Sequence, residues 1–200
     1  MRFTTAIMEQ PLGYRLWQAP FAERKLAPLF RHTDPDTIRR VLDVGCGPGT
    51  NTHHFTHADY LGIDINERYI ESAHRRHGRA FLAADVTTYR VADGERFDCI
   101  LVNSFLHHID TDNARRILTH LGTLLTPDGY VHILDLIMPA HASVGRMLAR
   151  WDRGDFPRPL ADWHRLFTDA FEPVVFEPYA LGSVGVTLWN MIYFKGRVRR

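Results

Sequence analysis

A glycine-rich segment, residues 45–49 with the sequence GCGPG, is the part of this 200-residue chain best suited to hold a ligand. Glycine lets the backbone turn sharply and lets a ligand approach backbone N–H groups with no Cβ in the way. An acid, Asp43, stands two residues before the first glycine, and the apolar run 41–44 leads into the segment. The spacing Gly-x-Gly-x-Gly therefore predicts a ligand-binding turn at the end of a buried strand.

Two further acids follow apolar runs in the same way. Asp64 ends the run 60–63, about 20 residues after the first glycine, where a carboxylate can accept hydrogen bonds from both hydroxyls of a ribose. The alternative for Asp64 is a cap on a helix over 66–77. Asp85 follows the run 80–83, where it can accept a hydrogen bond from an exocyclic amine while Val86 packs on a purine; the alternative is a surface acid.

The glycine spacing also separates two classes of nucleotide site. A dinucleotide-binding turn has the pattern Gly-x-Gly-x-x-Gly/Ala, and this chain has Thr50 where the third small residue would stand. Pro48-Gly49 also changes the helix N-terminus that would face a pyrophosphate. A Rossmann oxidoreductase using NAD(P) is therefore disfavoured but stays an alternative, as does a turn that binds nothing.

The elements that position these residues alternate between short apolar runs and longer amphipathic segments. This alternation predicts an α/β fold: a Rossmann-like, seven-stranded, mostly parallel sheet, its last strand antiparallel, with helices on both faces in a three-layer sandwich. The first five strands are expected to be interleaved with helices. The predicted strands are 41–44, 60–63, 80–83, 97–102, 130–134, 173–176 and 186–194.

Two helical segments are predicted with different clarity. Residues 114–125 place leucines at spacings of three and four, with cap candidates at 110–112 and a stop at Pro127-Asp128-Gly129. Residues 14–30 read as one or two helices, broken around Pro20 and Pro28. We expect one domain, divided into an N-terminal helical cap (1–37), a cofactor-binding core (38–135), a substrate-side lid (136–172) and C-terminal strands (173–200).

Composition limits the class of protein. The chain is 45% hydrophobic with a net charge of +1, which suits one globular domain and offers no basic surface for nucleic acid. No apolar run reaches the roughly 18 residues that span a membrane, and the N-terminus has no apolar stretch typical of a signal peptide. Cys46 and Cys99 have neither metal-site nor disulfide spacing, so we expect a cytoplasmic protein.

Together, the glycine turn and the acids at 43, 64 and 85 resemble the class I S-adenosylmethionine-dependent methyltransferase family of small-molecule type, over roughly residues 38–135. The resemblance implies that the turn cradles the methionine and ribose portions, the second-strand acid holds the ribose and the third-strand acid meets adenine. S-adenosyl-L-methionine would be the cofactor and S-adenosyl-L-homocysteine the product. The cofactor-binding residues would be Asp43, Gly45, Cys46, Gly47, Gly49, Asp64, Ile65, Asp85, Val86 and Asn103. Tyr14 and Gln18, one helical turn apart, would close over the methionine.

The same resemblance narrows the chemistry. The chain has Asn103-Ser104-Phe105-Leu106 where amide and nucleobase methyltransferases carry an Asn/Asp-Pro-Pro-Tyr/Phe segment, which argues against those acceptors. Because Asn103 replaces an acid of the metal-dependent members, we expect no metal. In-line displacement from a sulfonium needs mainly alignment, although a hydroxyl or carbon acceptor also needs a base. His107 and His108, after the fourth strand, and His164, in the lid, are the candidate general bases.

The lid segment predicts the kind of methyl acceptor. It contains Met138, Met147, Trp151, Phe156, Trp163 and Phe167, a set that fits either core packing or the cover of an apolar substrate. We therefore expect methyl transfer to a small, apolar or aromatic metabolite, without nucleic acid or membrane partners, by a monomer or homodimer. A protein that binds S-adenosylmethionine without methylating is the main alternative, and an RNA methyltransferase is disfavoured by the neutral charge.

Overall fold

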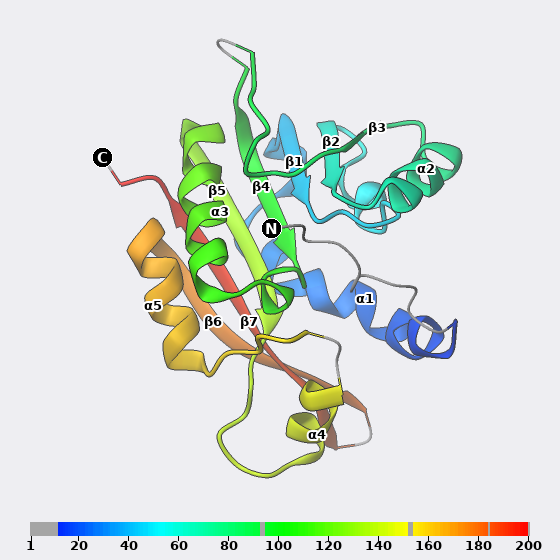
Figure 1. The fold of residues 1–200 in the computed structure, drawn as a ribbon, viewed down its shortest axis with the longest axis vertical. Helices are drawn as coiled ribbons and strands as arrows, with labels where there is room; N and C mark the ends of the chain where they lie inside the picture. The colour runs from blue at the N-terminus through cyan, green and yellow to red at the C-terminus, as the bar shows by residue number, and fades with distance from the viewer. Residues whose placement is uncertain (1–11, 93–94, 152–153, 184, 200) are drawn as a thin grey trace.

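The computed structural model describes residues 12–92, 95–151, 154–183 and 185–199, and gives the backbone alone for 12–20, 22 and 151 (Figure 1). One seven-stranded sheet runs through the molecule in the order β3-β2-β1-β4-β5-β7-β6. All neighbours pair in parallel except β7, which is antiparallel to both β5 and β6. The strands are β1 Arg40–Val44, β2 Asp59–Asp64, β3 Ala80–Ala83, β4 Phe97–Asn103, β5 Leu125–Leu136, β6 Glu172–Ser183 and β7 Val186–Arg197. The predicted sheet is confirmed.

The strands of the sheet coincide with the predicted apolar runs, with two differences at their ends. β5 begins at Leu125, and its pairing with β4 shifts register between Phe97 and Cys99. The predicted stop at 127–129 therefore lies inside β5 as an irregularity rather than before the strand. β6 continues to Ser183, well past the predicted run, because its whole length pairs with β7.

Five α-helices and three short 3-10 helices accompany the sheet in the described residues. The α-helices are α1 Leu12–His32, α2 Glu67–Arg76, α3 Thr111–Leu124, α4 Val144–Trp151 and α5 Leu160–Ala170. The 3-10 helices are η1 Pro35–Thr37, η2 Thr52–Phe55 and η3 Leu106–His108. As predicted, Asp110 caps α3, accepting a hydrogen bond from the Asn113 backbone N–H at 3.0 Å.

The expected helix between every pair of early strands is wrong at two places. Between β1 and β2 the chain forms only η2, and the described residues between β3 and β4 form no helix. Neither segment carries a sustained apolar period of 3.6 residues, which is what a helix needs to bury a face on a sheet. The N-terminal segment is a single helix through Pro20 and Pro28 rather than a broken one.

Helices cover both faces of the sheet, which confirms the three layers. α3 and α5 lie side by side over one face, where Leu118 and Phe167 pack with Leu42 of β1 (Figure 1). α1 and α2 lie on the other face, where Leu29 of α1 packs with Val41. Successive residues of β1 thus face opposite layers, as the two-residue period of a strand requires. Asp43 is on the face of Val41, towards α1.

The predicted lid forms α4, which lies beyond the carboxyl ends of the parallel strands, and α5, which instead packs on the sheet face beside α3 (Figure 1). Ala149 of α4 and Phe21 of α1 share a small apolar cluster with Trp189 and Met191 of β7, so the lid and the N-terminal helix are packed together. Within the described residues no helix is both long and apolar enough to span a membrane. The four-part division of the chain stays a prediction.

Arg158 fastens the lid to the end of the sheet. Its guanidinium is 6% exposed and donates to the carbonyl oxygens of Leu106 (2.9 Å) and Ile109 (2.6 Å). It also lies 4.8 Å over the ring of Trp163. Met138 donates its backbone N–H to the Arg158 carbonyl at 2.9 Å, so the segment before α5 is held on both sides. A buried arginine with several carbonyl partners is costly to remove, because the acceptors lose their donors.

We predict that Arg158→Ala lowers the free energy of unfolding by about 2–4 kcal/mol, since buried carbonyl groups lose a charged donor. Arg165→Ala is the matched control, because Arg165 is exposed and pairs with the partly exposed Asp162 on the same helix. Its expected cost is below about 0.5 kcal/mol. Urea unfolding of both variants measures the difference; equal costs would contradict a fastening role for Arg158.

Candidate functional site

The glycine turn between β1 and η2 is built by residues in the left-handed region of backbone space. Gly45, Gly47 and Gly49 have φ angles of 68°, 54° and 80°. A Cβ on Gly45 would lie 2.7 Å from the Phe105 ring, and one on Gly49 would lie 2.8 Å from His77. A Cβ on Gly47 would meet nothing within 4 Å. Only Gly47 therefore combines a left-handed backbone with open space on its side-chain side, as a ligand cradle requires.

Asp64 holds the glycine turn in place from the end of β2. Its Oδ2 accepts a hydrogen bond from the Gly47 N–H at 2.9 Å, and its Oδ1 accepts one from the Asn66 N–H at 2.8 Å. Burial raises the pKa of Asp64, and these two backbone N–H groups oppose that rise. The cap of α2 is Asn66 rather than Asp64. Each carboxylate oxygen has a second lone pair, so both can still accept a hydrogen bond from a ligand hydroxyl.

Asp43 is fully buried at the end of β1 with one of its oxygens unsatisfied. Oδ2 accepts hydrogen bonds from the Tyr60 hydroxyl at 2.6 Å and from the Asn51 amide at 3.1 Å. Oδ1 has no hydrogen-bond partner in the described part of the chain. Burial raises the pKa of Asp43 from its ordinary value of 3.8 to about 6, although the two donors lower it. A buried acceptor without a donor costs stability, so a ligand that donates a hydrogen bond to this oxygen would gain the most binding free energy there.

A chain of side-chain hydrogen bonds extends this site to β4 and α1. Asn103 donates its amide to Asn51 Oδ1 at 3.2 Å, and the Ser104 hydroxyl donates to Asn103 Oδ1 at 3.3 Å. Lys25 of α1 donates to the Ser104 hydroxyl at 3.0 Å. Ser104 has a φ of 55°, the one positive φ of a non-glycine residue in the described chain. Such backbone strain is often found at functional sites.

Among the other predicted cofactor residues, some side chains are free to meet a ligand and others are not. Asp85 is exposed and uses Oδ1 to accept hydrogen bonds from the Thr87 N–H and hydroxyl, both at 2.8 Å. Ile65, beside Asp64, is 51% exposed. In contrast, Val86 and Cys46 are 6% and 2% exposed and pack into the core. These two side chains leave little surface for a cofactor, and their place in the cofactor site stays a prediction.

The three candidate bases are placed very differently. His107 is 3% exposed, and its Nδ1 lies 2.6 Å from Oδ1 of Asp135, the buried acid near the end of β5. Burial alone would raise the pKa of Asp135, but the His107 ring and two backbone N–H groups outweigh it and hold that pKa below its ordinary value. His108, on η3, is exposed. His164 lies against Phe176 of the edge strand β6, three strands away from β4. The structure therefore does not bring His164 to the glycine turn.

Some predicted residues of the cap and lid lie outside what the structure describes. Tyr14 and Gln18 are both in α1, but their side chains, like that of Trp151, are outside the described residues. The rest of the lid divides in two. Trp163 and Phe167 are fully buried core residues, whereas Met147 and Phe156 are 45% and 41% exposed. The second pair is the apolar lid surface that a substrate could meet.

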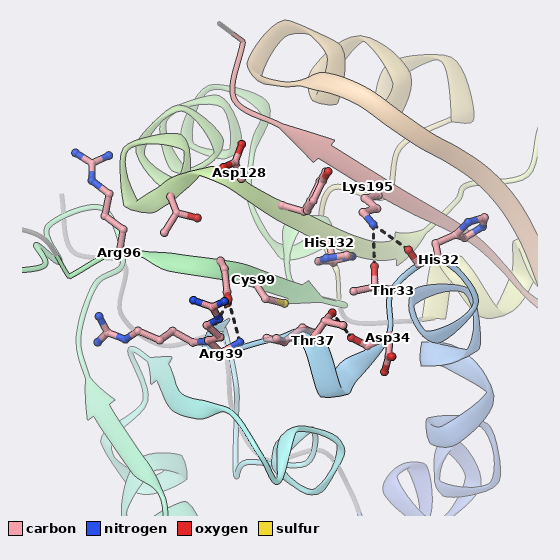
Figure 2. A pocket seen from close by; sticks show the side chains of 15 residues that line it. His32, Thr33, Asp34, Thr37, Arg39, Arg96, Cys99, Asp128, His132 and Lys195 are labelled. Atoms are coloured by element: carbon pink, nitrogen blue, oxygen red, sulfur yellow. Dashed lines mark hydrogen bonds between the residues drawn. The ribbon is translucent and has the colours of Figure 1, made fainter.

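A cavity of about 680 Å³ lies at the opposite edge of the sheet, where β1, β4 and β5 begin (Figure 2). Two of its charged groups are already engaged with the protein. Asp98 accepts hydrogen bonds from the backbone N–H groups of Arg39 and Arg40, and Lys195 donates to the His32 carbonyl and to the Thr33 hydroxyl. Ligands of open α/β sheets bind beyond the carboxyl ends of the strands, so the glycine-turn edge is the better candidate.

Four residues of the site were missed by the sequence interpretation: Lys25, Asn51, Tyr60 and Ser104. The signal for Asn51 was its place just after the glycine turn, and the signal for Ser104 was its place just after β4. Tyr60 and Lys25 gave no such signal, because their polar ends meet Asp43 and Ser104 only through the packing of β2 and α1.

Comparisons with known proteins agree with this geometry. Residues 41–129 match the family described as a methyltransferase domain. An uncharacterised methyltransferase of Mycobacterium bovis is 32% identical over 105 residues, covering 50% of this chain and 52% of that protein. A ubiquinone biosynthesis O-methyltransferase of Rhodopseudomonas palustris is 30% identical over 141 residues, covering 66% and 53%. The chain thus spans about half the length of the curated relatives it matches.

Solved structures share the whole fold at low sequence identity. The N-methyltransferase NodS from Bradyrhizobium japonicum, solved with S-adenosyl-L-homocysteine, has a TM-score of 0.72 and 20% identity, covering 97% of this chain and 94% of that one. The plantazolicin methyltransferase BpumL, solved with the same compound, has a TM-score of 0.70 and 18% identity, covering 94% and 88%. Residues 41–129 are therefore identified as a methyltransferase domain, set in a chain that has the fold of solved methyltransferases.

Proposed function

We propose that this protein is an S-adenosylmethionine-dependent methyltransferase that acts on a small molecule. The observation that carries the proposal is the open cradle at Gly47, whose backbone N–H donates to Asp64. The unsatisfied Oδ1 of Asp43, in the strand that leads into the glycine turn, adds to it. The match of residues 41–129 to a methyltransferase domain supports it independently. Because the chain spans only about half the length of its curated relatives, the activity of the whole protein is also a proposal.

The carboxylate acceptors of the site suit the separate parts of S-adenosylmethionine. Asp64 retains lone pairs for the ribose hydroxyls, and the exposed Ile65 beside it offers an apolar surface for the adenine ring. The exposed carboxylate of Asp85 would accept from the adenine amine through Oδ2, since Oδ1 is the oxygen that Thr87 occupies. Asp43 Oδ1 would serve the methionine ammonium, directly or through water, since a cation there offsets the cost of the buried carboxylate. Tyr14 and Gln18 remain proposed covers of the methionine.

Methyl transfer itself asks this chain mainly for alignment and exclusion of water. The cofactor, when bound, supplies a methyl group on a positively charged sulfur. An acceptor's lone pair would take that methyl group as the carbon–sulfur electron pair returned to sulfur. The protein's share is to hold acceptor, methyl carbon and sulfur in line, which the glycine turn, the Asn51–Asn103 network and the lid are placed to do.

His107 is the base candidate that the fold orients. Its ring is fixed by Asp135, and a Cβ on Gly154 of the lid would clash with its Cδ2. The lid therefore covers His107 directly, and proton transfer from an acceptor would require the lid segment to move. His108 remains a second candidate on the exposed surface of η3. An amine acceptor, already nucleophilic, would need neither.

An apolar or aromatic acceptor is the finer part of the proposal. The exposed lid residues Met147 and Phe156 support it. So do the functions by which two relatives are named, the ubiquinone biosynthesis O-methyltransferase and a fatty-acid O-methyltransferase of Mycolicibacterium smegmatis. We further propose a cytoplasmic protein, monomer or homodimer, with no nucleic-acid partner. The alternatives are a protein that binds the cofactor without methylating and, less favoured, an NAD(P)-dependent oxidoreductase.

Calorimetric titration of the full chain tests the cofactor. We expect S-adenosylmethionine and S-adenosylhomocysteine to bind at micromolar concentrations and NAD not to bind, because Thr50 stands where a dinucleotide-binding turn has its third small residue. Incubation with methyl-labelled cofactor and a panel of phenols and fatty acids then tests transfer. Binding of NAD but of neither sulfur compound would sink the proposal, and cofactor binding without transfer to any acceptor would favour the non-methylating alternative.

Gly47→Ala should weaken cofactor affinity by more than tenfold, because its Cβ would fill the open cradle. Gly185→Ala is the matched control. Gly185 also has a positive φ (77°), and a Cβ there would meet nothing within 4 Å. It lies, however, in the turn between β6 and β7, away from the glycine turn. Both variants should lose about 1–2 kcal/mol of stability to left-handed strain. Calorimetry then separates them: wild-type affinity in Gly47→Ala would remove this residue from the site.

The stability contributed by Asp43 should fall as pH rises. Its folded pKa of about 6 lies above the ordinary 3.8, so the folded state binds the proton more tightly than the unfolded chain. The contribution is fully present below about pH 4 and is lost as pH rises through 6, by about 3 kcal/mol in total. In ligand-free protein, urea unfolding from pH 4.5 to 7.5 should show wild type losing about 2 kcal/mol relative to Asp43→Asn. A difference that stays constant with pH would contradict a raised pKa for Asp43.

A further inference from the structure

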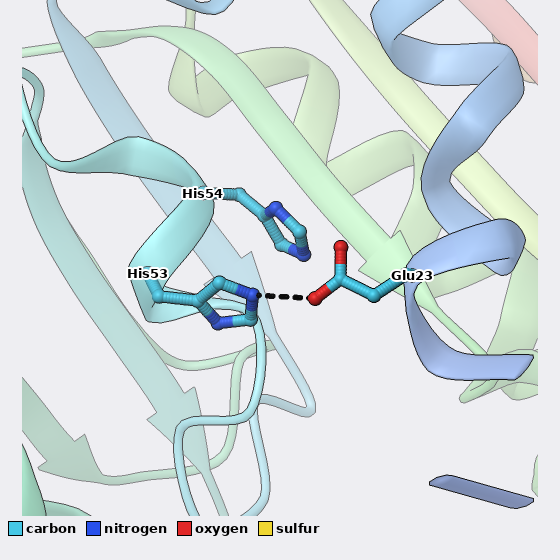
Figure 3. A group of neighbouring side chains, drawn as sticks. All are labelled: Glu23, His53 and His54. Atoms are coloured by element: carbon cyan, nitrogen blue, oxygen red, sulfur yellow. Dashed lines mark hydrogen bonds and ion pairs between the residues drawn. The ribbon is translucent and has the colours of Figure 1, made fainter. Parts of the chain in front are cut away.

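Three potential metal ligands meet between α1 and η2. Figure 3 shows Glu23 projecting from α1 towards the imidazole rings of His53 and His54, which stand next to each other on η2. Nε2 of His53 lies 3.2 Å from Oε1 of Glu23. The ring centroids of His53 and His54 are 3.8 Å apart. One ligand atom from each of the three residues lies within 4.8 Å of the others.

The spacing of these atoms suits a small divalent ion. Zinc binds imidazole nitrogen and carboxylate oxygen at about 2.0–2.2 Å in tetrahedral geometry, which puts neighbouring ligand atoms about 3.3 Å apart. The separation between His53 and Glu23 already matches this value. The side chains of Glu23 and His53 are 72% and 56% exposed, so small rotations can bring the third atom into range without disturbing the core.

The local chemistry also favours a metal over a simple ion pair. His54 is half-buried, with its ring centroid 5.1 Å from that of Phe30. Burial lowers the pKa of His54, the neighbouring His53 lowers it further, and Glu23 opposes both. Two imidazoles and one carboxylate form a set of ligands typical of zinc sites.

We propose that Glu23, His53 and His54 bind a divalent transition-metal ion of the zinc type, with water in the fourth position. The ion would join α1 to the segment that follows the glycine turn. His53 and His54 come directly after Asn51 and Thr52, and Asn51 donates to Asp43. The metal thus braces the N-terminal helix against the polar network of the proposed cofactor site. The expectation of no metal concerned an acidic cluster after β4, which is a different place in the fold.

Zinc titration of the chelator-treated full chain, in competition with a chromophoric chelator, tests the site. We expect one zinc equivalent to bind, and Glu23→Gln, His53→Ala and His54→Ala each to weaken that binding by at least tenfold. His57→Ala is the matched control, because His57 is an exposed histidine of the same segment outside the cluster. Melting of the metal-free variants by circular dichroism confirms that they fold.

Two additional readouts make the result decisive. Cobalt(II) in the same site should give the strong visible absorption of four-coordinate geometry, and zinc should raise the melting temperature of wild type and His57→Ala but not of the three ligand variants. Unchanged zinc affinity in the ligand variants, or weak binding that is lost equally in His57→Ala, would overturn the proposal. Either result would mean that zinc binds non-specifically to exposed histidines. These measurements use no cofactor, so they stand or fall separately from methyl transfer.

Discussion

The burial of the Asp43 carboxylate at the end of β1 is the constraint around which the candidate site is organised. A carboxylate removed from water is expensive unless hydrogen-bond donors surround it. Tyr60 and Asn51 supply donors to one oxygen, and supplying them requires β2 and the segment after the glycine turn to be held close to β1. The other oxygen has no donor in the described chain. The fold thus keeps an unsatisfied acceptor near the end of the strand that leads into the glycine turn, and a cationic ligand group would stabilise it.

A second buried acid has a similar role near the end of β5. Asp135 accepts hydrogen bonds from the backbone N–H groups of Leu106 and Leu136 and pairs with His107. Arg158 then ties the lid to the same loop through the Leu106 carbonyl. The loops at the carboxyl edge are therefore held by buried charged groups. This is how a chain with only a short 3-10 turn after β1, and no helix in the described residues between β3 and β4, can keep its site ordered.

The strands were predicted closely, and the reason is physical. A parallel strand with both faces buried is a continuous apolar run, so β1 and β4 are visible in the residues themselves. The prediction of the helices was less accurate where the local preference of the sequence and the tertiary packing disagree. Proline in a helix interior costs about 3 kcal/mol, which argued for a break in α1. The buried contacts of Leu26 and Leu29 with the sheet offset that cost, and they depend on strands far along the chain.

The sequence by itself determined the glycine turn, the acids at or just after the ends of β1, β2 and β3, and the order of the strands, because spacing and hydrophobic period are local properties. Only the tertiary structure decided which polar groups meet. The pairs Asp43–Tyr60 and His107–Asp135 and the cluster of Glu23 with His53 and His54 join residues 17 to 31 positions apart. Such contacts depend on the strand order and on the face of the sheet to which each helix packs. Periodicity says that a residue is buried or exposed, but it does not say against what.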